Sequence, residues 1–123
     1  MSNGTAASSK RVLIVEDELM IRMLLEGMLT DLGHSVAAEA GGLDEAIALA
    51  KQAEFDLAVL DVNLNGTPVT PVVEILVERG VPFIFASGYG QRGLPEAYRT
   101  APILQKPFQA DALAEAIRAV AAS

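Results

Sequence analysis

Short apolar runs, separated by segments with helical periodicity, dominate the chain from residue 12 onward. Val12–Val15 (VLIV) contains four apolar residues with no polar position between them. Such a run is typical of a strand that is covered on both faces of a parallel sheet. The pattern predicts five strands, at Val12–Val15, Ser35–Ala40, Leu57–Leu60, Pro82–Ala86 and Ile103–Gln105, of which the second has a weak signal.

Three other stretches carry apolar residues at the spacing of an amphipathic helix. The three sets are Ile21, Leu24, Leu25, Met28 and Leu32; Leu43, Ala46, Ile47 and Ala50; and Leu113, Ala116, Ile117 and Val120. Gly33 follows the first set and suits the left-handed residue that ends a helix. Met20, Met23 and Met28 fall within the first helix, and we interpret them as packing in the core and on its flank.

Prolines and glycines predict the remaining boundaries. Pro68 and Pro71 flank the start of a further helix that runs to about Arg79, since proline is tolerated in a first helical turn. Ser87–Gly93 holds three glycines and is interpreted as a mobile loop. Leu94–Thr100 is predicted as a short helix.

Five strands that alternate with about five helices imply right-handed crossovers and a parallel sheet covered on both faces. We therefore expect an α/β fold with a doubly wound, flavodoxin-like sheet of strand order 2-1-3-4-5. Residues 1–9 are small and polar and are expected to form a disordered lead-in to one domain at residues 10–122. Ligands of such sheets lie beyond the carboxyl ends of the strands.

Composition excludes several classes of site and ligand. The net charge of -7 opposes binding to nucleic acid backbones and to anionic membranes. The chain has no cysteine, so disulfides and thiolate chemistry are excluded, and its one histidine, His34, is interpreted as a loop residue. No apolar run is long enough for a membrane-spanning helix, and a secretory signal is not evident. These features predict a cytoplasmic protein.

Three carboxylates are expected to meet at the carboxyl edge of the sheet. Glu16 and Asp17 directly follow the first strand, and Asp61 follows the third apolar run. Each close pair of carboxylates at ~5 Å costs about 3 kcal/mol at an effective dielectric constant of ~20. A hard divalent cation relieves this repulsion, and Mg²⁺ fits because it prefers oxygen ligands. The carbonyl group of Asn63 can supply another oxygen.

The same edge carries the groups that phosphoryl transfer requires. One carboxylate can attack phosphorus once the ion is present, which gives an aspartyl phosphate. Lys106 follows the fifth strand and can neutralise the phosphoryl oxygens. Ser87 follows the fourth strand and can donate a hydrogen bond to another of them.

These pieces together resemble the receiver domain of two-component response regulators over about residues 10–122. The matching motifs are V-L-I-V-E-D-E at 12–18, L-A-V-L-D-V-N-L at 57–64, P-F-I-F-A-S-G-Y-G at 82–90 and L-Q-K-P-F at 104–108. The resemblance implies that Asp61 is the phosphoacceptor and that Glu16 and Asp17 hold Mg²⁺. It also implies that Ser87 contacts the phosphoryl group and that Lys106 pairs with it.

Other features of the resemblance concern the conformational switch. F-A-S-G-Y-G is similar to the "FAT GUY" subgroup, which is often found as stand-alone receivers, and the family pattern implies a cis peptide bond before Pro107. Receivers usually carry an aromatic residue at the position of Ile103 and a proline near Asn65. Because Ile103 cannot act as the usual aromatic switch, Tyr89 is the candidate substitute, together with Ser87.

The resemblance implies a single-domain response regulator. Its expected partners are a phosphodonor, which is a sensor histidine kinase or a histidine phosphotransfer protein, and a separate output protein. The domain is expected to be a monomer or a weak dimer. A receiver-like scaffold that is never phosphorylated is an alternative. A flavodoxin-like cofactor binder is less favoured, because the acidic E-D-E-L-M after the first strand repels phosphate and Gly41-Gly42 lacks a dinucleotide-binding spacing.

Overall fold

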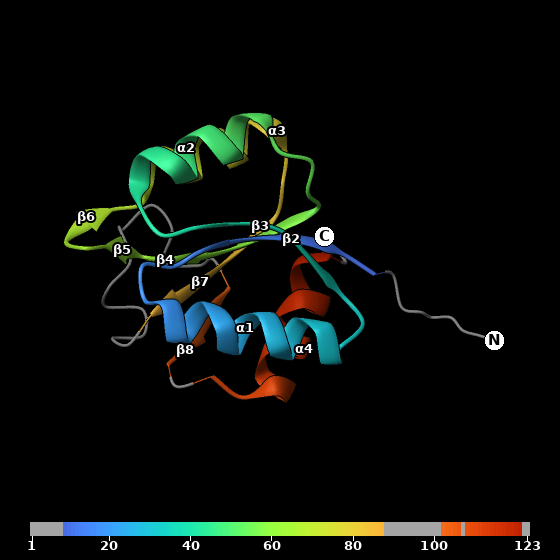
Figure 1. Cartoon of the computed structure of the whole chain (residues 1–123). Coiled ribbons are helices and arrows are strands. Elements are labelled where there is room, and N and C mark those ends of the chain that lie inside the picture. Colours follow the sequence, from blue (N-terminus) through green and yellow to red (C-terminus); the bar gives the residue numbers. More distant parts are fainter. Residues whose placement is uncertain (1–8, 88–101, 107, 122–123) are drawn as a thin grey trace.

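The computed structural model describes residues 9–87, 102–106 and 108–121, and places a five-stranded parallel sheet between two layers of helices (Figure 1). In chain order the elements are β2 (Arg11–Val15), α1 (Leu19–Asp31), β3 (Ser35–Ala40), α2 (Leu43–Gln52), β4 (Leu57–Asp61), β5 (Asn63–Leu64), β6 (Thr67–Pro68), α3 (Thr70–Arg79), β7 (Phe83–Ser87), β8 (Ile103–Gln105) and α4 (Ala110–Ala121). The sheet order is β3-β2-β4-β7-β8, which confirms the predicted order 2-1-3-4-5.

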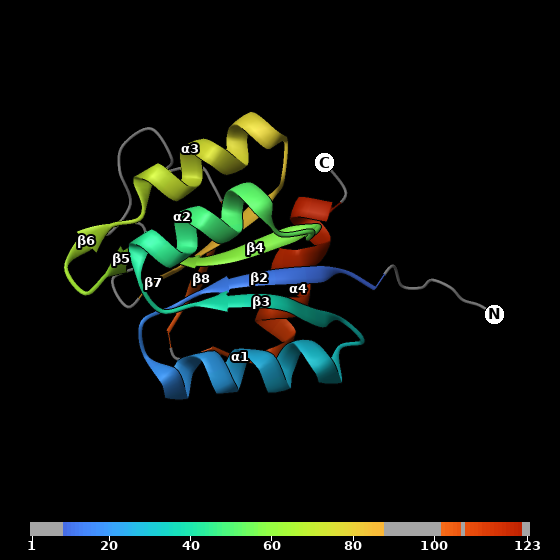
Figure 2. The same cartoon turned by 45° about the horizontal axis from the view of Figure 1, so that its top comes forward.

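Each face of the sheet has its own apolar core. Leu13 and Val15 of β2 pack in the cluster that α2 and α3 cover, whereas Val12 and Ile14 pack in the cluster under α1 and α4. All four side chains are fully buried, as the continuous apolar run predicted. Figure 2 shows α2 and α3 on one side of the sheet and α1 on the other.

The backbone contacts between strands are regular except at the edge strand β3. Four parallel pairings join the five strands, and in the pairing of β2 with β3 the register shifts between Val12 and Leu13. Val12 pairs with Val36 and Leu13 pairs with Ala38, so Ala37 is the extra residue of a bulge.

Helix ends follow the expected local chemistry. Gly33 has a φ of 92° just after α1, as predicted, and Gly80 with a φ of 73° ends α3. Pro71 lies in the first turn of α3, whereas Pro68 belongs to β6 and not to the start of the helix. The two prolines therefore flank the start of α3 at Thr70, as predicted, and a short antiparallel hairpin that the sequence did not predict precedes the helix.

The apolar face of α1 also differs from the prediction. Leu25 and Leu29 are buried, while Leu24 is 42% exposed. Met20 and Met23 are 82% and 60% exposed, so the expectation that they pack in or beside the core was wrong for both. The helix carries one apolar stripe against the sheet and a second one toward solvent near its start.

The sequence also predicted features outside the described residues. They are the lead-in at 1–8, most of the 87–93 loop, the helix at 94–100 and the cis bond before Pro107. Within the described residues, no helix is both long and apolar enough to cross a membrane.

Candidate functional site

Four strands place polar side chains at one edge of the sheet. Glu16 and Asp17 follow β2 directly, Asp61 is the last residue of β4, and Ser87 is the last residue of β7. Lys106 follows β8 by one position, and its backbone N–H donates to the Ser87 carbonyl at 2.9 Å. The predicted site residues therefore lie at one end of the fold, where parallel strands expose their carboxyl ends.

The three carboxylates form a compact cluster. One oxygen from each of Glu16, Asp17 and Asp61 lies within 4.8 Å of the others. The Glu16 side chain is 1% exposed and that of Asp61 is 13% exposed. Because close carboxylates repel one another and burial disfavours charge, the cluster favours a bound cation.

Lys106 provides the positive charge that the protein itself brings to this cluster. Its Nζ lies 2.9 Å from Glu16 Oε1 and 3.2 Å from Asp61 Oδ2. The contact with Asp61 is a hydrogen bond. Burial lowers the pKa of Lys106, but its close contact with Glu16 and the negative charges of Asp61 and Glu16 outweigh that effect and raise the pKa overall. Lys106 therefore stays charged and holds two carboxylates that come from different strands.

Backbone donors orient the same carboxylates. The Glu18 N–H donates to Glu16 Oε2 at 3.1 Å, and the Asn63 N–H donates to Asp61 Oδ1 at 3.3 Å. Glu16 Oε1 has no well-oriented hydrogen-bond donor among the described residues, although it lies close to the ammonium group of Lys106. A buried oxygen in this state is suited to a metal ion.

The burial of Glu16 has an electrostatic consequence. Desolvation raises the pKa of Glu16 from 4.5 to about 7, and the negative charge of Asp61 adds to this shift. Lys106 and the Glu18 N–H act in the opposite direction but do not compensate fully. The metal-free site therefore exchanges a proton near neutral pH.

The structure brings together Glu16, Asp17, Asp61 and Lys106, with Ser87 buried beside them on the next strand. Asn63 follows Asp61 by two residues and binds it through its backbone N–H. Tyr89 and Pro107, expected to take part in switching, lie outside the described residues.

Sequence reasoning missed two features next to this site. One is the hairpin of β5 and β6, which begins two residues after Asp61. The other is an exposed apolar surface at the start of α1, made of Leu19, Met20, Met23 and Leu24. Its signal was present in the sequence, because these residues form two pairs at the i, i+4 spacing of a helix.

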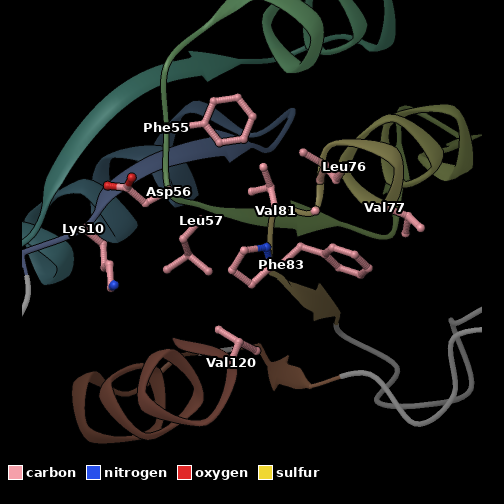
Figure 3. A pocket seen from close by; sticks show the side chains of 11 residues that line it. Lys10, Phe55, Asp56, Leu57, Leu76, Val77, Val81, Phe83 and Val120 are labelled. Atoms are coloured by element: carbon pink, nitrogen blue, oxygen red, sulfur yellow. The ribbon is translucent and has the colours of Figure 1, made fainter. Parts of the chain in front are cut away.

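A cavity of about 670 Å³ lies at the other end of the sheet (Figure 3). Its walls come from the segments that precede β4 and β7 and from the end of α3, and include Phe55, Leu76 and Phe83. The acidic residue on its wall, Asp56, is already paired with Arg11 at 3.1 Å. The cavity is lined by Lys10 and this single aspartate, whereas the cluster of Glu16, Asp17 and Asp61 brings three carboxylates together with Lys106 and is the candidate functional site.

Comparisons with known proteins agree with this geometry. Residues 12–118 match the family model described as the response regulator receiver domain. The transcriptional regulatory protein PdtaR of Mycobacterium tuberculosis is 37% identical over 120 residues, which cover 94% of this chain and 58% of PdtaR. The chain thus matches a little over half of that relative's length. The chemotaxis protein CheY of Thermotoga maritima is 32% identical over 118 residues, which cover 90% of this chain and 97% of CheY.

Solved structures of other proteins are also similar to this chain. The solution structure of SdrG from Sphingomonas melonis Fr1 has a TM-score of 0.85 and 38% identity, and covers 94% of this chain and 99% of SdrG. A BeF3-activated conformation of SdrG has a TM-score of 0.77 and 40% identity, and covers 89% of this chain and 93% of that one. The chain therefore belongs to the response regulator receiver domain family.

Proposed function

We propose that Asp61 is the phosphoacceptor of this receiver and that a phosphohistidine is the donor. The observation that carries the proposal is the position of Asp61, at the end of the central strand β4, beside two other carboxylates and bonded to Lys106. In the transfer, an Asp61 oxygen forms a bond to phosphorus while the bond from phosphorus to the imidazole nitrogen breaks. The nitrogen leaves with the electron pair, and no other group is oxidised or reduced.

The acidic residues fit a magnesium site. Glu16, Asp17 and Asp61 offer carboxylate oxygens within 4.8 Å of one another, and the Asn63 carbonyl is the proposed further ligand. The buried Glu16 Oε1, which lacks a well-oriented donor, supports this assignment. When bound, Mg²⁺ supplies positive charge that offsets the charge of the phosphoryl oxygens.

Lys106 and Ser87 are proposed to recognise the phosphoryl group. Lys106 already touches Asp61, so its ammonium group can turn from the carboxylates to a phosphoryl oxygen that forms on Asp61. The Ser87 hydroxyl is proposed to donate to another phosphoryl oxygen. The proposal that Tyr89 and Pro107 take part in the switch rests on the family resemblance.

The exposed apolar surface of α1 is proposed as the docking side for the phosphodonor protein. α1 begins two residues after Asp17, and its start lies at the same end of the sheet as the β5–β6 hairpin (Figure 1). Met20 and Met23 are 82% and 60% exposed there. A protein that brings a phosphohistidine to Asp61 must cover the rim of the site, and exposed apolar side chains on that rim gain free energy when they are buried.

We infer that the donor is a sensor histidine kinase or a histidine phosphotransfer protein and that the output is carried by a separate protein. Phosphorylation changes the affinity for that protein, since a new dianion at the edge of the sheet redistributes the contacts of Lys106 and Ser87. The chain's own catalytic role is limited to forming and hydrolysing its aspartyl phosphate. The BeF3-activated conformation of SdrG supports such a switch in a relative.

Intact-mass measurement after treatment with a small acyl phosphate tests the proposal. We expect one phosphoryl group on the wild-type protein with Mg²⁺, and none with EDTA or in Asp61→Asn. The matched control is Asp56→Asn, which removes an aspartate at the opposite end of β4. Asp56→Asn should be labelled like the wild type. Labelling of Asp61→Asn equal to that of the wild type would contradict the assignment. A complete lack of labelling of the wild-type protein in Mg²⁺ would favour the scaffold alternative.

A further inference from the structure

The β5–β6 hairpin ends in a two-residue loop with unusual backbone geometry. Asn65 and Gly66 connect Leu64 to Thr67, which face each other in the antiparallel pairing. Their φ angles are 51° and 86°, both in the left-handed region, as a type I′ turn requires. Both residues are exposed. The hairpin therefore presents an Asn-Gly peptide bond directly to water.

We propose that Asn65 is a site of spontaneous deamidation that lies beside the phosphoacceptor loop. The Gly66 backbone nitrogen loses its proton to water and forms a bond to Cγ of Asn65, while the bond from Cγ to Nδ2 breaks and ammonia leaves. Water then opens the resulting five-membered succinimide ring at either carbonyl. The products are aspartate or isoaspartate, and water is the one co-reactant.

Three features of the hairpin favour this reaction. Gly66 has no Cβ, so the approach of its nitrogen to the Asn65 side chain meets little steric hindrance. No hydrogen bond from the Gly66 N–H is found within the described part of the chain. A two-stranded hairpin with two residues in each strand is also marginal by itself, and its loop opens readily.

The chain contains its own internal control for the chemistry. Asn63 is also exposed, but Leu64 follows it, and the Leu64 side chain is 2% exposed. A residue that is branched and held in the core slows the approach of its nitrogen to the preceding side chain. Asn63 is further held by its N–H bond to Asp61. We therefore expect Asn63 to persist while Asn65 converts.

The modification reaches the candidate site through the backbone. The Val69 N–H donates to the Val62 carbonyl at 3.1 Å and closes the base of the hairpin, and Val62 directly follows Asp61. Isoaspartate adds one methylene group to the backbone of a two-residue loop, so the type I′ geometry and the position of Leu64 cannot both be kept. Aspartate keeps the backbone but adds one negative charge to the loop of the hairpin that follows Asp61. This functional consequence rests on the proposed role of Asp61.

Peptide mapping of aged protein tests the chemical step. Wild-type protein and Asn65→Gly, which keeps a residue suited to positive φ, are incubated for several days at mildly alkaline pH and digested with trypsin. Asn63 and Asn65 lie in one tryptic peptide and are separated by fragmentation, whereas Asn3, also followed by glycine, lies in another. We expect Asn65 to convert at least about tenfold faster than Asn63, because Asn65 is followed by a residue without Cβ, whereas Asn63 is followed by Leu64. Equal rates at the two positions would overturn the proposal.

Phosphorylation of the same samples tests the consequence. Fresh wild type, fresh Asn65→Gly and fresh Asn65→Asp are compared with the aged forms in the acyl phosphate assay. We expect aged wild type to label several-fold more slowly than fresh wild type, and Asn65→Gly to keep its rate after the same incubation. If both proteins age identically, the link to the site is wrong. If fresh wild type is not labelled, the proposed function fails, while the peptide map still decides the chemistry.

Discussion

Glu16 provides a test of the site that does not depend on phosphorylation. Its side chain is 1% exposed, and burial raises its pKa from 4.5 to about 7. At a pH between these two pKa values, Glu16 keeps its proton in the folded protein but has already released it in the unfolded chain. The folded state is therefore favoured at low pH and loses stability as the pH rises through the folded pKa. One pKa unit corresponds to about 1.4 kcal/mol, so the full interval gives at most about 3.5 kcal/mol.

We expect metal-free wild type to lose about 2 to 3 kcal/mol of unfolding free energy, relative to Glu16→Gln, between about pH 5 and about pH 8. The glutamine variant keeps the shape of a protonated glutamate and cannot ionise. Subtracting the unfolding free energies of the two proteins also cancels the pH dependence that other titrating groups contribute. Burial lowers the pKa of His34, which has the opposite pH dependence, and burial raises the pKa of Glu39, which has the same one.

Urea unfolding followed by circular dichroism, in EDTA and in Mg²⁺, measures these free energies. Mg²⁺ should stabilise the wild type most at the higher pH, where Glu16 is ionised and can bind the ion, and should have a smaller effect on Glu16→Gln. If the difference in unfolding free energy between wild type and Glu16→Gln does not vary with pH, the electrostatic reasoning is refuted. A stabilisation by Mg²⁺ that is equal in both proteins would remove Glu16 from the metal site.

Two other predictions concern the surface and the scaffold. Met20→Asp should slow transfer from a phosphodonor protein about tenfold or more, while labelling by a small acyl phosphate and the unfolding free energy stay unchanged, because this side chain is 82% exposed. Arg79→Met should lower the unfolding free energy by about 2 kcal/mol, measured with urea, since Arg79 donates to two carbonyl groups at the end of α2 and lies 5.0 Å from the Phe55 ring. Arg118→Met, which removes an exposed ion pair on α4, is the matched control and should have almost no effect.

The sheet and the site could be predicted because their signals are local. Val12–Val15 is apolar at every position, which a strand covered on both faces requires, and polar residues appear directly where such strands end. The parallel topology then brings Glu16, Asp17 and Asp61 to one edge. The contact of Lys106 with Glu16 could not be predicted in this way, since it depends on side-chain directions at residues 90 positions apart.

The errors have equally specific causes. The start of α1 carries apolar residues on two sides, and periodicity alone does not tell which side faces the sheet, so Met20 and Leu24 were assigned to the wrong surroundings. Asn65-Gly66 is a strong signal for a hairpin turn, but β5 and β6 have two residues each and show no alternation that would identify them as strands.

The bulge at Ala37 has a consequence for the behaviour of many copies of the chain at high concentration. β3 is an edge strand, so one row of its backbone N–H and C=O groups is open to another chain. A regular edge can accept a foreign strand along its whole length, whereas a bulge twists the strand locally and interrupts the row of donors and acceptors. The irregular pairing of β3 therefore opposes edge-to-edge aggregation while its partner β2 stays fully paired inside the sheet.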